Sequence, residues 1–366
     1  MIRKIFLSLV GIGMLVILAA LLRPSPIDAV SLDLPEPPAA TAVLASNNLL
    51  QQAKRLAPGE IVHPEDIAFD DEGRLYTGSS NGRIYRISFH EDNSVANVEE
   101  FAETGGYPLG LHFDQQGNLI AAVKDIGLVA IDANGAVTVL TNATAGVPII
   151  YADELDIASD GVIYFSDAST KYTWGWPYDF LEGRPNGRFL AYYPDTGETA
   201  VLHDNLYFAN GVVLAPDESY VLVGETAVAR IMRFWLKGEQ AGTMEIFAEN
   251  LPNSPDNISV DENGRYWVAG NLRSSQLETL HQYPFIKNQL AKLPFSFLRN
   301  MPQNEALRYG FVLVLDENGQ PIASLHDETG HIYSVSSAQP YGEHLYLGTL
   351  FGDAIGRLPL TDLIDE

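Results

Sequence analysis

The chain has 366 residues, of which 46% are hydrophobic and 19% are charged, and this composition excludes a wholly disordered or collagen-like protein. Its 22 basic and 47 acidic residues give a net charge of −25, a surface that repels phosphate backbones and argues against nucleic acid as a partner. The chain has no cysteine, which excludes disulfides, thiolate metal sites and cysteine nucleophiles.

The first 23 residues predict a transmembrane helix. The run Ile5–Leu22 carries no charge and reaches the short end of the length that spans a bilayer. Arg3 and Lys4 precede it, which places the amino terminus in the cytoplasm and the rest on the periplasmic, extracellular or lumenal side. The run exceeds a usual signal-peptide core and lacks a clear cleavage site, so we favour an anchor over a cleaved signal, which would yield a secreted protein. Residues 24–42, rich in Pro, Ala and Ser, predict a flexible linker.

Residues 43–366 predict an all-β fold, a six-bladed β-propeller. An apolar strand, a polar turn and a strand rich in β-branched and aromatic residues recur as IAFDDEGRLYTG, LHFDQQGNLIAAV, LDIASDGVIYFSD, VVLAPDESYVLVGE, ISVDENGRYWVAG and the weaker GEHLYLGTL. Equivalent positions in the second strands are Tyr76, Ile120, Tyr164, Val221, Trp267 and Tyr346. Their steps are 44, 44, 57, 46 and 79 residues. A period in the forties is typical of a propeller, whereas a β-sandwich with Asp-Gly hairpins is not expected to keep it.

The first long step contains an aromatic insertion, YTWGWPYDFLEGRPNGR. Long excursions inside a compact repeat are usually functional loops or lids, so we expect this one to cover a mouth of the ring. Trp174, Trp176 and Tyr178 are its candidate substrate-binding residues. The alternative is that they only pack the insertion against the flank of a blade.

The second long step contains an insertion of about residues 272–306, which its prolines divide into short predicted helices. Its apolar residues are flanked by Lys287, Lys292 and Arg299, a pattern that also fits contact with a membrane. The last repeat has only three strands of its own, so a segment within residues 43–62 is expected to supply the fourth and close the ring.

Candidate metal ligands lie 11 residues before each repeat position, on the strand expected to line the central channel. These positions are Glu65, Leu109, Asp153, Asn210, Asp256 and Val335. Four of them carry a side-chain oxygen, and Asn257 adds a fifth such group. Carboxylates that share a channel need raised pKa values or a cation, and an all-oxygen set favours Ca²⁺ over Mg²⁺ or Mn²⁺. The alternative is that these residues only form turns and strand starts.

Several motifs resemble the strictosidine synthase-like family, which is related to gluconolactonases and paraoxonases. They include HPEDIAFD, YPLGLHFD, YADELDIASDGVIYFSDAST, FANGVVLAPDESYVLVGET and LPNSPDNI, and the resemblance covers about residues 45–360. It implies a six-bladed propeller with a metal in its channel, and an animal membrane relative has an amino-terminal anchor and is associated with arylesterase activity. By this resemblance the calcium positions of the hydrolytic relatives are matched by Glu65, Asp153, Asn210, Asp256 and Asn257.

The chain departs from the family pattern at two places. Ser334, Val335 and Ser336 stand where the plant synthase has its catalytic Glu, and Leu109 stands where paraoxonases have a His at the channel mouth. The first departure argues against the amine–aldehyde condensation of the synthase. The second argues against a His-based proton relay.

The combined prediction is a membrane-anchored, calcium-dependent hydrolase of small-molecule esters or lactones. Asp256 is the predicted catalytic base, with Glu65 as a weaker candidate, and the absence of a Gly-x-Ser-x-Gly motif argues against a serine esterase. A non-catalytic binding or scaffold propeller with a structural metal is the main alternative. A strictosidine synthase-type lyase is the least favoured.

Overall fold

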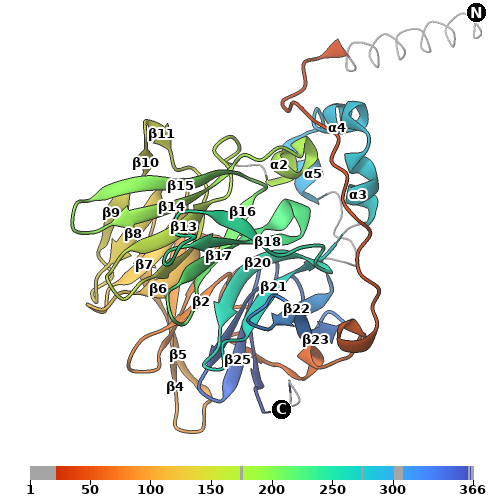
Figure 1. Cartoon of the computed structure of the whole chain (residues 1–366). Coiled ribbons are helices and arrows are strands. Elements are labelled where there is room, and N and C mark those ends of the chain that lie inside the picture. Colours follow the sequence, from red (N-terminus) through yellow and green to blue (C-terminus); the bar gives the residue numbers. More distant parts are fainter. Residues whose placement is uncertain (1–21, 174–175, 274, 301–307, 362, 364–366) are drawn as a thin grey trace, which may run out of the picture.

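The computed structural model describes residues 22–173, 176–273, 275–300, 308–361 and 363. These residues form six four-stranded antiparallel sheets arranged as the blades of a propeller (Figure 1). The prediction of a six-bladed all-β propeller is therefore confirmed. No helix within the described ranges is long and apolar enough to cross a membrane. The predicted anchor lies outside the described residues except for its last two positions.

In the first five blades the strands follow chain order from the innermost to the outermost. Blade 1 contains β2 (Ile67–Phe69), β3 (Leu75–Gly78), β4 (Arg83–Phe89) and β5 (Val95–Glu103). Blade 2 contains β6 (Tyr107–Phe113), β7 (Leu119–Lys124), β8 (Gly127–Ile131) and β9 (Val137–Thr141). Blade 3 contains β12 (Ala152–Ile157), β13 (Ile163–Asp167), β14 (Gly187–Tyr193) and β15 (Glu198–Leu206), and a short hairpin precedes it, β10 (Ala143–Thr144) and β11 (Val147–Pro148).

The remaining blades complete the ring. Blade 4 contains β16 (Ala209–Leu214), β17 (Tyr220–Glu225), β18 (Arg230–Trp235) and β19 (Met244–Ala248). Blade 5 contains β20 (Asn253–Val260), β21 (Tyr266–Leu272), β22 (Gly310–Leu315) and β23 (Pro321–Asp327). Blade 6 contains β24 (Val335–Tyr341), β25 (His344–Thr349), β26 (Ile355–Pro359) and the amino-terminal β1 (Lys54–Leu56).

The amino-terminal strand closes the ring. Lys54 lies opposite Arg357 and Leu56 opposite Ile355 in an antiparallel pair at the outer edge of blade 6. This confirms the prediction that a segment within residues 43–62 supplies the fourth strand. Closure by both ends of the chain leaves no open gap in the ring.

The core lies between the blades, which explains why the second strand of each repeat is apolar on both faces. On β21, Tyr266 packs with Leu222 of blade 4, whereas Trp267 packs with Leu347 of blade 6. Both aromatic side chains are at most 1% exposed. A strand buried on both sides gains free energy from continuous rather than alternating apolar residues.

Polar turns join the first two strands of most blades. In blade 5 the Asp261 carboxylate accepts hydrogen bonds from the backbone nitrogens of Asn263 (2.9 Å) and Arg265 (3.0 Å). Gly264 follows with φ +75°, a left-handed conformation that glycine adopts without strain. This chemistry produces the recurring Asp-x-x-Gly signature of the sequence.

The two insertions form helices, as predicted, and lie at the same end of the ring. Helix α2 (Trp176–Glu182) joins β13 to β14, and α3 (Ser275–His281), α4 (Pro284–Leu290) and α5 (Phe295–Asn300) lie between β21 and β22. In an antiparallel blade the second strand ends where the first begins. The helices therefore cap the face at which the innermost strands start, which we call the upper face (Figure 1).

The segment 24–42, predicted to be a flexible linker, contains an extended stretch that is held against this helical cap. Val30 donates its backbone N–H to the Glu182 carbonyl (3.0 Å), and Leu32 donates to the His281 carbonyl (3.2 Å). Ile27 is only 6% exposed. The flexibility expected from composition is corrected here, because hydrogen bonds and apolar burial fix this stretch. Two 3₁₀ turns, η1 (Ala42–Leu44) and η2 (Leu50–Gln52), lead to β1, and η3 (Thr226–Val228) follows β17.

Candidate functional site

A β-bulge recurs at the same level of the innermost strands and determines which side chains face the channel. In blades 2 to 6, three residues of the inner strand pass two of its neighbour. A bulge adds one residue and redirects the side chains around it. Counting blade 1, where the pair precedes β2, the bulge residues are Glu65–Asp66, Leu109–Gly110, Asp153–Glu154, Asn210–Gly211, Asp256–Asn257 and Ser336–Ser337.

The structure brings the five predicted metal ligands together from four blades. Asn210 Nδ2 donates to Asp256 Oδ1 over 2.6 Å, and Asn257 Nδ2 lies 3.4 Å from Glu65 Oε1. Asp153 is close enough to Asp256 for their charges to repel. All five side chains are buried, with exposures between 1% and 6%. We refer to these five residues as the upper ring.

The sixth predicted position, Val335, does not belong to the ring. Its side chain is fully buried between blades, in the cluster that contains Trp267. The hairpin that follows β24 is one residue shorter than that of blade 5, so a count of 11 stops one residue early. Ser336 takes the ring position, and the hydroxyls of Ser336 (2.7 Å) and Ser337 (3.1 Å) donate to the main-chain oxygen of Glu65.

The electrostatics of the upper ring are those of a site short of positive charge. Burial raises the pKa of Asp256 to about 7. Burial, and after it the charge of Asp256, raise the pKa values of Glu65 and Asp153 well above their usual range. Without a cation, carboxylates this deeply buried tend to take up protons.

Unsatisfied oxygens supply a direct test of whether the residues fit a metal. Glu65 Oε2, Asn210 Oδ1 and Asn257 Oδ1 are buried and have no hydrogen-bond partner among the described residues. Buried oxygens without partners are costly, and a hard cation such as calcium binds this kind of donor. Within the described residues, His, Asp and Glu side chains alone form no group of three that could hold a metal. The fit therefore depends on the two amides as well as the carboxylates.

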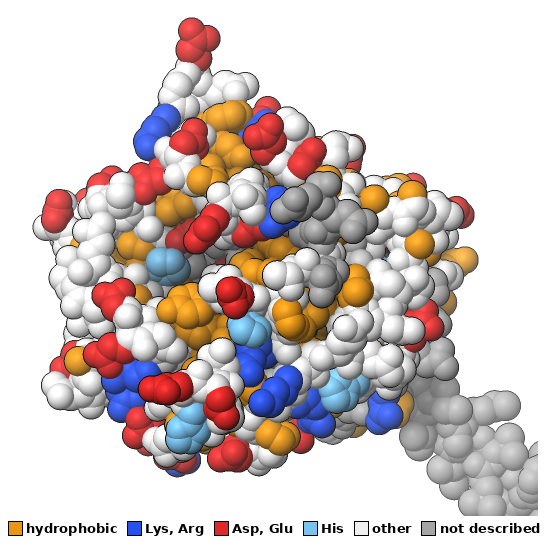
Figure 2. All heavy atoms as spheres, turned by 90° about the horizontal axis from the view of Figure 1, so that it is seen from below, with side chains coloured by type: hydrophobic (Ala, Val, Ile, Leu, Met, Phe, Trp, Pro, Cys, Tyr) orange, Lys and Arg blue, Asp and Glu red, His pale blue; other side chains and the backbone are white. Residues whose placement is uncertain are grey.

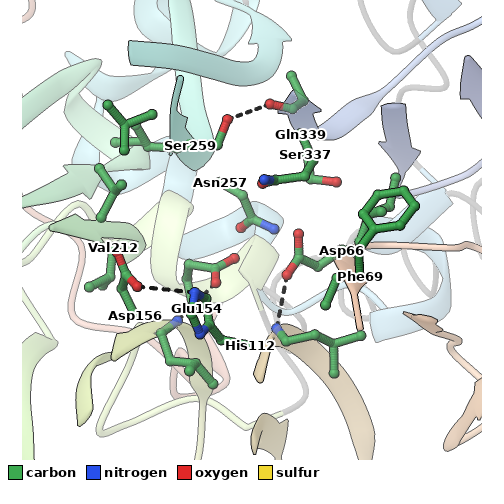
Figure 3. A pocket seen from close by; sticks show the side chains of 18 of the residues that line it. Asp66, Phe69, His112, Glu154, Asp156, Val212, Asn257, Ser259, Ser337 and Gln339 are labelled. Carbon is green, nitrogen blue, oxygen red and sulfur yellow. Dashed lines mark hydrogen bonds and ion pairs between the residues drawn. The ribbon is translucent and has the colours of Figure 1, made fainter. Parts of the chain in front are cut away.

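Below the ring, the second members of the bulge pairs line a cavity of about 250 Å³ (Figure 3). Asp66, Glu154 and Asn257 reach it from three blades. Asp66 Oδ2 accepts the backbone N–H of Leu111 (2.8 Å), and burial raises the pKa of Asp66 to about 6. Seen from below, acidic side chains are spread over the surrounding face (Figure 2).

His112 and Asp156 form an ion-pair contact on the wall of this cavity. Their Nε2 and Oδ1 atoms are 3.4 Å apart, and the other Asp156 oxygen accepts the backbone N–H of Leu214 over 2.8 Å. Neither residue was predicted from the sequence as part of the site. The available signal was their place one or two residues beyond the bulge pairs, Gly110 and Glu154.

Aromatic side chains gather around Leu109 at the upper ring level. Trp176 packs in a cluster with Leu109, Tyr151 and Phe208, and Phe180 contacts Trp176 edge-on with ring centroids 5.8 Å apart. Burial, then the negative charge of Asp153, raise the pKa of Tyr151 well above its usual value. This cluster therefore reaches from the helical cap to the ring.

The three predicted substrate-binding residues have different outcomes. Trp176 lies in the cluster just described. Tyr178 is on the opposite face of α2, in contact with Tyr172 and Phe295, and so packs the insertion. Trp174 lies outside the described residues. Tyr151, Phe180 and Phe208 were not predicted as members of this wall.

Comparison with known proteins agrees with this geometry. Residues 153–239 match the strictosidine synthase family model, and residues 42–87 match the model of the strictosidine synthase-like amino-terminal region. Protein strictosidine synthase-like 4 of Arabidopsis thaliana is 35% identical over 327 residues, 88% of this chain and 86% of the relative. The adipocyte plasma membrane-associated protein of Bos taurus is 35% identical over 381 residues, 98% of this chain and 91% of the relative.

Solved structures with this fold include enzymes and a calcium-binding protein. A gluconolactonase of Xanthomonas campestris superposes with a TM-score of 0.60 at 19% identity, covering 92% of this chain and all but 1% of its own. The calcium-binding protein regucalcin of Agrobacterium tumefaciens gives a TM-score of 0.56 at 15% identity, covering 83% of this chain and 92% of its own. At these identities the likeness shows the fold.

Proposed function

Because the chain belongs to the strictosidine synthase-like family, we propose that it is a calcium-dependent hydrolase of small esters or lactones, of the arylesterase or lactonase type. The observation that carries the proposal is the upper ring. Five oxygen-bearing side chains from four blades converge in the channel, and three of their buried oxygens lack a partner among the described residues. The gluconolactonase and regucalcin folds support the same class of activity and the same cation.

Each upper-ring residue has a role in this proposal. Glu65, Asp153, Asn210, Asp256 and Asn257 hold the cation. Bound there, calcium would polarise the substrate carbonyl and stabilise the oxyanion that develops. Mg²⁺ and Mn²⁺ are the other hard cations suited to this donor set.

Asp256 acts as the general base. Its carboxylate takes the proton from the attacking water while the water oxygen bonds to the carbonyl carbon. The ester or lactone C–O bond then breaks, and the leaving oxygen receives that proton. The Asn210 amide, 2.6 Å from Asp256 Oδ1, keeps the base oriented. The aromatic cluster around Trp176 and Tyr151 holds the apolar part of the substrate and limits access of water.

The location proposed for this activity is a membrane surface. The predicted anchor places the propeller on the periplasmic, extracellular or lumenal side. The similarity to adipocyte plasma membrane-associated proteins, which covers 98% of the chain, supports membrane association.

Hydrolysis of phenyl acetate and of a panel of lactones tests the proposal. Wild-type protein should turn over at least one of them with calcium and lose that turnover with chelator. Asp256→Asn should abolish turnover, whereas Asp261→Asn, the same change at the hairpin of the same blade, should not. Turnover that is insensitive to chelator, or no turnover on any substrate, would contradict the proposal.

A scaffold propeller with a purely structural metal is the second candidate. It is favoured by the fact that the ring residues link four blades and so would stabilise the fold without any chemistry. In that case Asp256→Asn lowers thermal stability while the wild type has no activity. A synthase-type lyase is least supported, because Ser336 stands at the ring position of blade 6 and its hydroxyl is bonded to the Glu65 carbonyl oxygen.

A further inference from the structure

Large apolar side chains are concentrated on the outside of the helical cap. Five of the thirteen exposed large hydrophobic residues among those described lie between positions 283 and 297. They are Tyr283, Phe285, Ile286, Leu293 and Phe297, with exposures of 50%, 68%, 45%, 36% and 54%. We call this set the α4–α5 patch. Singly exposed apolar residues are normal on proteins, but a concentration of this kind indicates a surface that binds something apolar.

The charge of this region differs from that of the rest of the chain. No Asp or Glu occurs between residues 279 and 304, although the chain has 47 acidic residues in 366. The same stretch contains Lys287, Lys292 and Arg299. Apolar side chains in a setting without acidic residues suit a lipid interface, where aromatic residues lie at the headgroup level and anionic headgroups repel carboxylates.

The amino-terminal chain ties this cap to the predicted anchor. Ile27 and Ala29 pack in one cluster with Ala291 and Leu298 of the second insertion. Lys287 Nζ donates to the Val30 carbonyl over 2.6 Å. The described chain enters beside α4 and runs along the cap (Figure 1). The domain is therefore held to the amino-terminal segment at the helices that carry the patch.

The length of this connection limits how far the patch can be from a bilayer. The uncharged apolar run ends at Leu22, and only five residues separate it from the docked Ile27. Fully extended, five residues span at most about 17 Å. A bilayer that holds the run must therefore lie within about that distance of the docking point on α4 and α5.

We propose that the α4–α5 patch inserts into the lipid interface next to the amino-terminal anchor, so that the upper face of the propeller rests on the membrane. Helix α2 extends this arrangement to the channel. Tyr178 and Leu181 pack toward the second insertion, whereas Trp176 and Phe180 pack toward the ring. The aromatic wall of the channel thus lies directly behind the membrane-bound helices. The inference rests on the anchoring part of the proposed function and is independent of hydrolysis.

Site-directed fluorescent labels test this proposal, and the absence of native cysteine makes single labels specific. Full-length Phe285→Cys and Phe297→Cys are labelled and reconstituted into phosphatidylcholine vesicles with ordinary or brominated acyl chains. Val139→Cys and Ile246→Cys are the matched controls, because these residues are 50% and 46% exposed on the outer strands β9 and β19.

The expected result is that brominated lipid quenches the labels at positions 285 and 297 and not the controls. The quenching should place them about 5–10 Å inside the interface, the depth of a surface-lying apolar face. Aqueous iodide should quench the two controls more strongly. Equal quenching of all four labels would overturn the proposal. Protection of positions 285 and 297 from iodide without quenching by brominated lipid would also overturn it, because a second protein copy would then cover the patch.

Discussion

Removal of calcium is expected to make the stability of the propeller depend strongly on pH. The perturbation acts on the upper ring, where burial raises the pKa of Asp256 from 3.8 to about 7 and shifts Glu65 and Asp153 in the same direction. A carboxyl whose pKa is higher in the folded than in the unfolded state binds its proton more tightly when folded. Its stabilising effect is complete below the unfolded pKa and is lost as the pH rises through the folded pKa.

The magnitude follows from the difference in the pKa of Asp256. A rise from 3.8 to about 7 corresponds to about 4 kcal/mol of stability lost between pH 4 and pH 8. The total free energy of unfolding of a typical domain is about 5–15 kcal/mol, so this loss is large. A bound divalent cation favours the ionised carboxylates and should remove most of the dependence.

Urea unfolding of the full-length chain in mild detergent measures the effect, with tryptophan fluorescence as the signal, because Trp267 is fully buried. With chelator, the free energy of unfolding should fall between pH 5 and pH 8, and with calcium it should change little. Asp256→Asn should flatten the chelated profile, whereas Asp261→Asn should leave it steep. A chelated wild type that is equally stable at both pH values would refute the reasoning, as would a slope that calcium does not change.

Three further substitutions test the packing of the blades and of the cap. Arg188→Met leaves Asp167 buried without the cation that lies 2.5 Å from it, so unfolding in urea should require about 3–5 kcal/mol less. Gly110→Ala adds a Cβ only 2.7 Å from the Glu154 Cα, so thermal unfolding should show a loss of about 1–3 kcal/mol. Ile27→Ser removes an apolar anchor of the amino-terminal stretch worth about 1.5–3 kcal/mol, so limited proteolysis should cut residues 24–36 faster.

Each of these changes has a control at an exposed site. Arg83→Met disrupts a surface ion pair and should cost at most about 1 kcal/mol. Gly117→Ala meets no atom within 4 Å, so it should cost only the strain of a left-handed residue, about 1–2 kcal/mol. Val139→Ser should leave proteolysis of the amino-terminal stretch unchanged. Equal effects of a substitution and its control would contradict the packing described for that site.

The propeller could be predicted because its repeats are determined by packing between blades. Residues such as Tyr266 and Trp267 face opposite neighbours, so the second strand must be apolar throughout, and the Asp261–Gly264 turn leaves a signature in every strong repeat. These constraints act over short stretches of sequence and are visible there. The insertions were also recognisable, since they interrupt a regular period.

The ring residues were found by counting along repeats of equal length. The count succeeded for Glu65 and Asp153, whose hairpins are equally long, and failed at Val335, where the hairpin is shorter by one residue. Side chains that alternate along a regular strand put Asp66 and Glu154 on the far face. The bulge brings both onto the channel, and nothing in the local sequence marks a bulge with certainty.

Contacts between distant parts of the chain were the features that the sequence did not predict. Composition made residues 24–42 a flexible linker, but the groups that hold this stretch, such as Glu182 and Lys287, lie more than 150 residues away. In the first insertion, the helical conformation of α2 separates Trp176 from Tyr178 onto opposite faces. Treating the aromatic residues as one wall overlooked that separation.

A crystal of the protein grown with calcium, with anomalous diffraction recorded to locate the ion, tests the central claim most directly. The account predicts a single strong peak in the channel within bonding distance of Glu65, Asp153, Asn210, Asp256 and Asn257, with occupancy lost in Asp256→Asn. A channel without an anomalous peak at saturating calcium would contradict it. So would an ion bound only below the ring, at Asp66 and Glu154.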